Sequence, residues 1–242
     1  MGVKGSERDL REGGAVWAGA EALWSTLALP LVACASLDDP QWADAVALPL
    51  SAADLRDAAG YPADDRRKRF LQRRAVLRCL VGQALGRAAA QVVIAHDAQG
   101  APSVVAPLDL ARTSRLHVSV AGRGSLAAFG LSWAPIGVDL EPVGAAVEPA
   151  WNLLHASERA WLEGLAAGER HRPFLQIWTV KEAYLKMHGL GLRIELSTVA
   201  VRISPDGTAR ISGNGQSQLT LKAQWRQLEL NGKALLVADA CV

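Results

Sequence analysis

The chain has 242 residues, of which 50% are hydrophobic and 21% are charged, and its formal net charge is +2. These values exclude a disordered chain, leave room for one large or two small domains, and give no reason to expect a nucleic-acid partner. The three cysteines are odd in number and lack the spacing of a metal site, which favours free thiols in a cytoplasmic protein.

The first residues of the chain predict a flexible tail over residues 1–15, because they are charged and lack the apolar core of a signal peptide. The most apolar early stretch, residues 23–37, is interrupted by Pro30 and is too short to span a bilayer. We therefore expect no membrane partner.

A helical region is predicted over residues 50–90, with Ser51 as an N-cap and an apolar stripe along one face. Seven of the 13 residues from Arg66 to Arg78 are Lys or Arg. Cations at the start of a helix oppose its dipole, so this cluster favours an anionic partner, although a solvated basic face explains it equally well. No groove-reading motif accompanies the cluster, which argues against nucleic acid. Short strands are predicted next, at residues 92–95, 116–119 and 126–131.

A further strand is predicted over residues 136–140, and Pro142 ends it because proline cannot donate to the ladder. Asp139 and Glu141 are two residues apart, so their side chains share one face of the strand. Carboxylates on an otherwise apolar strand must meet water, a cation or a basic partner. Two solvent-facing acids at a strand end are the ordinary explanation, and a hard cation such as Mg²⁺ is the alternative.

Two helices are predicted in the second half of the chain, one beginning near Ser157 and one beginning at Pro173 and ending at Gly189. The second helix places Glu182 and Lys186 four residues apart on one face, a spacing typical of a surface ion pair worth about 0.2–0.5 kcal/mol. The neighbouring residues are mostly apolar, however, so these charges require a partner or a ligand. Four strands complete an α+β chain, at residues 199–203, 208–211, 219–224 and 234–238.

The segment Gly137–Glu141, GVDLE, and the segment Trp178–Lys186, WTVKEAYLK, together resemble the paired motifs of the 4′-phosphopantetheinyl transferase superfamily. The resemblance is to the surfactin-synthetase-activating type, and it covers residues 20–240 with detailed matches only in the middle. It implies two similar α/β halves, residues 16–135 and 136–242, related by pseudo-twofold symmetry. It also implies a monomer that binds coenzyme A in the cleft between the halves.

The implied reaction is the Mg²⁺-dependent transfer of 4′-phosphopantetheine from coenzyme A to a serine of an acyl or peptidyl carrier protein domain. The resemblance assigns Asp139, Glu141 and Glu182 to the metal. It makes Glu182 and Lys186 the catalytic residues, acting on the serine proton and the pyrophosphate of coenzyme A. Lys181 projects about 100° away from Glu182 around the helix, toward the carrier or the solvent. The residues expected to contact the nucleotide are Ser119, Arg69, Arg74 and Arg78.

The sequence departs from the family pattern at the nucleotide end of the expected site. Where the family has Gly-Lys-Pro, this chain has Gly100-Ala101-Pro102, and Ser119 is followed by Val120 where the family has a histidine. Each lost contact to a phosphate costs about 1.5–3 kcal/mol. One alternative function is therefore a family member that binds carrier domains with weak or no catalysis. Another is a Mg²⁺-dependent phosphohydrolase that uses the same carboxylates.

Overall fold

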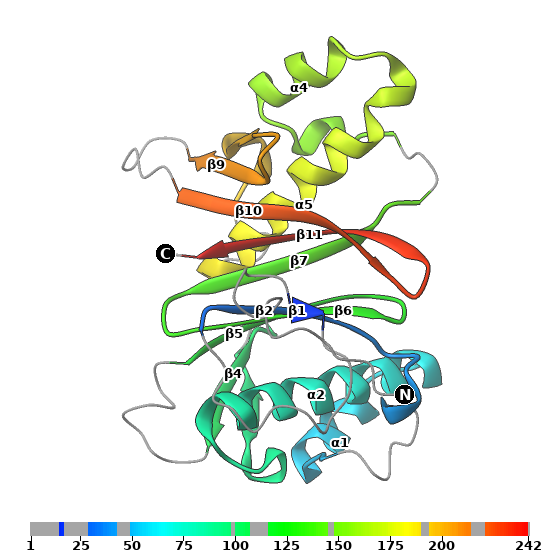
Figure 1. Cartoon of the computed structure of the whole chain (residues 1–242), viewed down its shortest axis with the longest axis vertical. Helices are drawn as coiled ribbons and strands as arrows, with labels where there is room; N and C mark the ends of the chain where they lie inside the picture. The colour runs from blue at the N-terminus through cyan, green and yellow to red at the C-terminus, as the bar shows by residue number, and fades with distance from the viewer. Residues whose placement is uncertain are drawn as a thin grey trace, which may run out of the picture.

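The structure is a computed structural model that describes residues 15–16, 29–42, 49–97, 100–106, 116–144, 148–189, 194–213 and 221–241. Helices and sheets are both present, which confirms the α+β class (Figure 1). The α-helices are α1 (Ala52–Ala59), α2 (Asp64–Leu85), α4 (Ala156–Glu163) and α5 (His171–His188). The strands are β1 (Ala15–Val16), β2 (Leu31–Ser36), β3 (Val93–His96), β4 (Pro102–Ala106), β5 (His117–Arg123), β6 (Leu126–Ser132), β7 (Ile136–Pro142), β8 (Ala200–Ile203), β9 (Thr208–Ser212), β10 (Leu221–Leu230) and β11 (Lys233–Cys241).

The first sheet has the strand order β1-β2-β6-β5, with β1 parallel to β2 and the other neighbours antiparallel. Successive side chains of a strand face opposite sides of the sheet. Ala33 and Phe129 accordingly pack in the apolar cluster that holds the buried face of α2, whereas Cys34 and Ala128 face the second sheet. β6 is buried along its whole length, as expected of a strand covered on both faces. β3 and β4 form a separate antiparallel pair.

The second sheet has the order β7-β11-β10-β9-β8 and is antiparallel throughout. In β11, Leu236 and Ala238 pack with α5, whereas Leu235 and Val237 pack with the first sheet. The layers therefore run from α1 and α2 through the two sheets to α5 and α4 (Figure 1). The first sheet ends at Ser132 and the second begins at Ile136. The two-domain division and the pseudo-twofold symmetry stay predictions.

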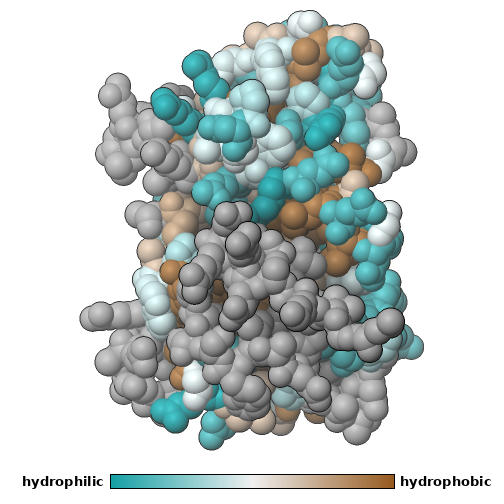
Figure 2. All heavy atoms as spheres, viewed as in Figure 1, coloured by the Kyte–Doolittle hydropathy of each residue, from teal (hydrophilic) through white to brown (hydrophobic). Residues whose placement is uncertain are grey.

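The surface of the described residues is mixed in polarity. Over α4 and the β10–β11 hairpin, the visible face is mainly hydrophilic with apolar patches between the polar side chains (Figure 2). The large apolar side chains that are exposed include Leu55, Val105, Trp133 and Trp161. In the ranges that the structure describes, no helix is long and apolar enough to cross a membrane.

The structure divides the predicted helical region into two helices. Ser51 caps α1 as predicted, because its side chain accepts a hydrogen bond from the backbone of Asp54. α2 begins earlier than its basic cluster, so Asp64 and Asp65 occupy the first turn. Acidic residues there stabilise the helix dipole. The position of the cations in the helix therefore gives no argument for an anionic partner, and that partner stays a prediction.

Further differences concern the strands that precede Ser132. β2 and β4 were not predicted, and β5 extends to Arg123, four residues beyond the predicted strand. Of the predicted tail, residues 1–14 lie outside the described residues, and Ala15 already pairs with β2.

Candidate active site

The close contact between β7 and α5 places the acidic motif beside α5, which we call the catalytic helix because it carries the predicted catalytic residues Glu182 and Lys186. Gly137 makes this contact possible, because a Cβ at that position would collide with the backbone of Ala183 and Met187. Glu182 and Lys186 lie on the turns of α5 that face this contact. Gly137 thus allows the two motif segments, Gly137–Glu141 and Trp178–Lys186, to pack backbone against backbone.

Asp139 and Lys186 form a direct ion pair, with Lys186 Nζ 2.6 Å from Asp139 Oδ1. Asp139 is buried, and its second carboxylate oxygen, Oδ2, has no hydrogen-bond partner among the described residues. Burial raises the pKa of Asp139, and the nearby Glu141 adds to this rise, while Lys186 opposes it. An unpartnered buried carboxylate oxygen is a ready acceptor for a cation.

Glu141 is held by two donors from different parts of the fold. Arg123 of β5 approaches both carboxylate oxygens, at 2.7 and 3.0 Å, and Trp178 of α5 donates its indole N–H at 3.0 Å. Arg123 was not identified from the sequence, because its contact joins strands 18 residues apart and belongs to no motif. The result is a bidentate charge-assisted pair that links the two sheets.

Glu182 is half-buried and lies near both other acidic groups. Burial is the main cause that raises its pKa, and the negative charges of Asp139 and Glu141 raise it further. Lys186 and Arg123 act in the opposite direction. A carboxylate with a raised pKa is a better proton acceptor than an ordinary surface glutamate.

The three acidic residues do not form a ready metal cage. No group of three His, Cys, Asp or Glu side chains within the described ranges gathers closely enough to hold a metal ion. Asp139 and Glu141 are instead paired with Lys186 and Arg123. Mg²⁺ needs only one or two carboxylates when substrate phosphates complete its shell. The free Oδ2 of Asp139 and the carboxylate of Glu182 fit this need, whereas Glu141 would first have to leave Arg123.

One cavity of about 260 Å³ connects the catalytic helix with the first sheet. Its lining includes Glu182 and Lys186 from α5 together with Ser119 and Val120 from β5, and Ala101. The catalytic residues predicted from one motif and the altered nucleotide positions are thus neighbours in space. We refer to this space as the catalytic cavity.

Ser119 contributes to the contact between β5 and β7. Its Oγ accepts a hydrogen bond of 3.0 Å from the backbone N–H of Val138, and its side chain is buried. A hydroxyl that accepts one hydrogen bond can still donate its own proton. The predicted contact of Ser119 with coenzyme A is compatible with this geometry and stays a prediction.

The three arginines predicted to contact the nucleotide have different surroundings. Arg78 is fully buried, lies 2.7 Å from Asp54, and donates to the backbone carbonyl of Val92. Arg69 pairs with Asp38 at 2.7 Å on the surface. Neither lines the catalytic cavity or the cavity next to it. Their contacts join α2 to the segments around it, and of the three arginines Arg74 is the one that lines either of these two cavities.

Arg74 lines a second cavity of about 280 Å³, which we call the arginine cavity. It adjoins the catalytic cavity, because Gly100, Pro102 and Val120 line both. Arg73 and His96 also line it and were not predicted. Arg73 belongs to the basic cluster that the sequence singled out, whereas His96 follows a predicted strand and carried no signal. The remaining lining includes the aromatic residues Tyr61 and Phe70.

Comparison with known proteins agrees with this arrangement. Residues 135–238 match the family model of the 4′-phosphopantetheinyl transferase superfamily. The chain is similar to this superfamily over these residues, which make up less than half of its length. The matched region contains the acidic motif, α5 and most of the second sheet, and it begins only where the predicted N-terminal half ends.

Individual relatives align with between 40% and 69% of the chain. A Synechocystis protein named as a candidate 4′-phosphopantetheinyl transferase is 32% identical over 154 residues, which is 62% of this chain and 61% of the relative. The 4′-phosphopantetheinyl transferase HetI of Nostoc is 28% identical over 174 residues, 69% of this chain and 70% of the relative. The 4′-phosphopantetheinyl transferase Sfp of Bacillus subtilis is 29% identical over 99 residues, 40% of this chain and 43% of the relative. The alignments thus span between about two fifths and about two thirds of these relatives.

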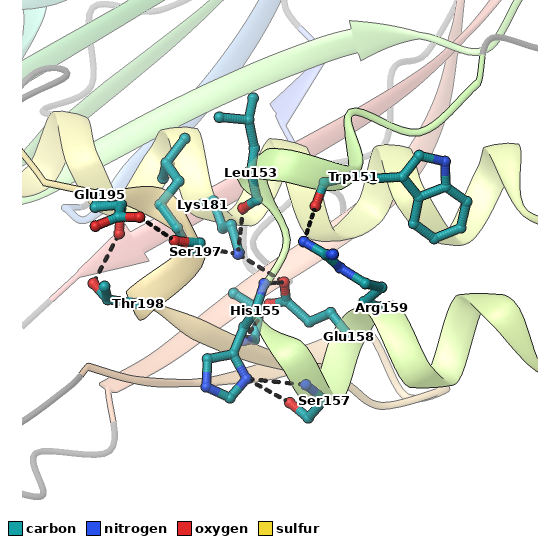
Figure 3. A network of polar contacts seen from close by, with 12 residues as sticks. Trp151, Leu153, His155, Ser157, Glu158, Arg159, Lys181, Glu195, Ser197 and Thr198 are labelled. Carbon is teal, nitrogen blue, oxygen red and sulfur yellow. Dashed lines mark hydrogen bonds and ion pairs between the residues drawn. The ribbon is translucent and has the colours of Figure 1, made fainter.

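Lys181 lies away from the catalytic cavity. It is buried, with its Nζ 2.7 Å from Glu158 of α4, and it donates to the carbonyls of Leu153 and Leu196 (Figure 3). The expectation that Lys181 faces the carrier or the solvent was wrong. Its 100° offset from Glu182 instead points it into the packing between α5 and α4, so the pair holds the catalytic helix in its orientation.

Proposed function

We propose that this protein transfers 4′-phosphopantetheine from coenzyme A to a serine of an acyl or peptidyl carrier domain, in a Mg²⁺-dependent reaction. The main support for this proposal is that Glu182, Lys186 and Ser119 line one cavity, and that Lys186 pairs with the buried Asp139. The relatives named above as 4′-phosphopantetheinyl transferases support the same reaction. The proposal includes a monomer of the surfactin-synthetase-activating type, with coenzyme A bound between two similar halves.

Lys186 would bind the pyrophosphate of coenzyme A. Its side chain is about one third exposed and lines the catalytic cavity, although it pairs with Asp139 in the structure. An ammonium group can exchange such a partner for a phosphate oxygen and offset the charge that builds up on the departing diphosphate. Mg²⁺, when bound by Asp139 and Glu182, would neutralise the same phosphates.

Glu182 would accept the proton of the carrier serine. The serine oxygen forms a bond to the phosphorus that carries the pantetheine arm, and the bond from that phosphorus to the bridging oxygen breaks. Adenosine 3′,5′-bisphosphate leaves with the electron pair, and the serine proton passes to Glu182. The raised pKa of Glu182 supports this role. No covalent intermediate with the protein is needed, so positioning and charge neutralisation supply the catalysis.

The first test is the intact mass of an apo carrier domain after incubation with the protein, coenzyme A and Mg²⁺. The wild-type protein should add the mass of one phosphopantetheine group, and Glu182→Gln should reduce the rate by roughly 100-fold or more, as expected for loss of a general base. Glu163→Gln changes an exposed glutamate of α4 and is the matched control. A Glu182→Gln protein as active as the control would overturn the assignment of the base.

The apolar lining at Val120 and Ala101 favours a second candidate, a family member that binds carrier domains with weak or no catalysis. Carrier binding without any change in mass would support this candidate against the transferase. The same incubation without a carrier tests the phosphohydrolase, because that activity alone would release adenosine 3′,5′-bisphosphate from coenzyme A.

A further inference from the structure

A cavity of about 710 Å³ lies between α4 and the strands β8 and β9, and we call it the α4–β8 cavity. All four residues of β8 line it, together with Ser157 and Trp161 of α4 and Arg210 of β9. It shares no lining residue with the catalytic cavity or the arginine cavity. Figure 1 shows α4 and β9 toward the end of the molecule opposite α1. The α4–β8 cavity is therefore separate from the candidate active site.

Two arginines in the wall of this cavity lie directly opposite each other on neighbouring strands. Arg202 of β8 and Arg210 of β9 are register partners in an antiparallel pair, and Lys222 of β10 is the next residue in register. Register partners share one face of a sheet, where two like charges destabilise each other. Both guanidinium groups are exposed, and neither makes an ion pair or a hydrogen bond with a residue that the structure describes. This face of the sheet therefore favours a partner that carries several negative charges.

The acidic residue in the wall of the cavity does not neutralise these arginines. Glu158 is buried, and its Oε1 accepts a hydrogen bond of 2.6 Å from the backbone N–H of Val201. Its Oε2 accepts a hydrogen bond of 2.8 Å from the backbone N–H of His155 and lies 2.7 Å from Lys181 Nζ (Figure 3). Both carboxylate oxygens of Glu158 are thus occupied, and the cavity keeps an excess of positive charge.

β8 is the edge strand of the second sheet, so it has a neighbouring strand on one side only. The backbone N–H of Ser204 donates to the carbonyl of Thr208, which shows that Ser204 directs its backbone groups toward β9. Backbone direction alternates along a strand, so Val201 and Ile203 direct theirs to the open edge. The bond from Val201 to Glu158 agrees with this direction. The backbone groups of Ile203 have no partner within the described ranges, and unpaired edge groups are a template for a further strand.

We propose that the edge of β8 binds an extended acidic segment of a partner protein, which adds to the second sheet as a further strand. Side chains alternate along a strand, so acidic residues at every second position of the segment face Arg202 and Arg210. Backbone hydrogen bonds to Ile203 supply affinity, and the carboxylates supply specificity. Trp161 is 46% exposed and offers an apolar contact beside the arginines. Tryptophan and arginine are the residue types that contribute most to protein interfaces.

Fluorescence polarisation of a labelled peptide of alternating glutamate and threonine tests the inference on the full chain. The wild type should bind this peptide and should not bind a peptide of alternating lysine and threonine. Arg202→Gln should weaken binding by about 5-fold, and the double variant with Arg210→Gln by about 20-fold. Arg66→Gln changes an exposed arginine of α2 and is the matched control, which should bind like the wild type. Absence of binding by the wild type, or equal binding by the double variant, would overturn the inference.

A second pair of variants tests whether the segment adds as a strand. Ile203→Pro removes the N–H at the open edge and keeps both arginines, and proline is tolerated where an edge N–H points away from the sheet. It should weaken binding by about 10-fold, whereas Ile203→Val keeps the N–H and should bind like the wild type. The Ile203 amide of the wild type should also exchange its hydrogen more slowly when the peptide is bound, a measurement that holds even if Ile203→Pro fails to fold.

Unchanged exchange at Ile203 would overturn strand addition, because charge alone would then hold the peptide. Complete displacement of the peptide by inorganic phosphate would overturn it as well, since the cavity would then be a site for small anions. Neither measurement requires catalytic activity, so the outcome is independent of the proposed function.

Discussion

The carboxylate of Glu182 lies where its negative charge is unfavourable. It is half-buried and near two other acidic groups, and these causes raise its pKa in the folded protein. A glutamate in the unfolded chain titrates near its ordinary value of about 4.3. Between this value and the higher folded pKa, the native state binds more protons than the unfolded state, so stability decreases as pH rises.

We therefore expect Glu182→Gln to be more stable than the wild type above this window, and the difference to disappear in acid, where Glu182 is neutral. Part of this gain is the removal of the repulsion between Glu182 and Asp139, which is one of the causes of the raised pKa. Urea unfolding of both proteins at several pH values measures the difference. A variant that is less stable at neutral pH would contradict this account of the site. The gain in stability should be accompanied by a loss of activity, because the carboxylate that is removed is the proposed base.

At the scale of elements, the contact between β7 and α5 determines the geometry of the site. We expect Gly137→Ala to destabilise the protein by about 1–3 kcal/mol or more, because the added methyl group meets backbone atoms that cannot move independently. The added methyl group should also push β7 away from α5 and separate Asp139 from Lys186. We therefore expect the variant to lose transfer activity. Denaturant unfolding and the carrier mass assay together measure both effects.

Gly144→Ala provides the comparison for this variant. A Cβ at Gly144 meets no atom within 4 Å, so the same chemical change should leave stability and activity near those of the wild type. Similar losses in the two variants would show that the close helix–strand contact is not what organises the site.

The elements that the sequence predicts correctly are those whose signals are local. The apolar run and terminal proline of β7, the cap at Ser51 and the glycine that ends α5 all act within a few residues. β2 was missed because both of its faces are buried, so it shows no alternation. Helix α2 was placed correctly, but its first turn was not recognised, because Asp64 and Asp65 precede the apolar stripe.

The candidate site shows the same difference between features that depend on local spacing and features that depend on contacts between distant segments. The four-residue spacing predicted one shared helix face for Glu182 and Lys186, and both side chains line the same cavity. The contacts that reach between elements were not predictable: Arg123 pairs with Glu141, and Lys181 turns toward Glu158. Pairwise contacts of this kind depend on the packing of distant segments and leave no periodic signal in the chain.

At the scale of the whole molecule, the two sheets are joined by an apolar layer and by polar contacts at its edge. Cys34, Leu126 and Ala128 of the first sheet pack against Leu235 and Val237 of the second. The bonds from Val138 to Ser119 and from Arg123 to Glu141 lie between the same strands. Because residues of both sheets form the candidate site, the site requires the two sheets to remain packed against each other.

We therefore expect calorimetry to show a single unfolding transition for the full chain, with equal calorimetric and van't Hoff enthalpies. Leu235→Ala should test this coupling, since the side chain is 1% exposed within the layer between the sheets. A buried leucine truncated to alanine costs about 2–5 kcal/mol, so the whole transition should move to lower temperature without dividing. Leu55→Ala, at a leucine of α1 that is 54% exposed, should change little. Two separate transitions in the wild type, or a shift of only part of the unfolding in Leu235→Ala, would mean that each half folds alone, and the catalytic cavity would then depend on docking between halves and not on one shared core.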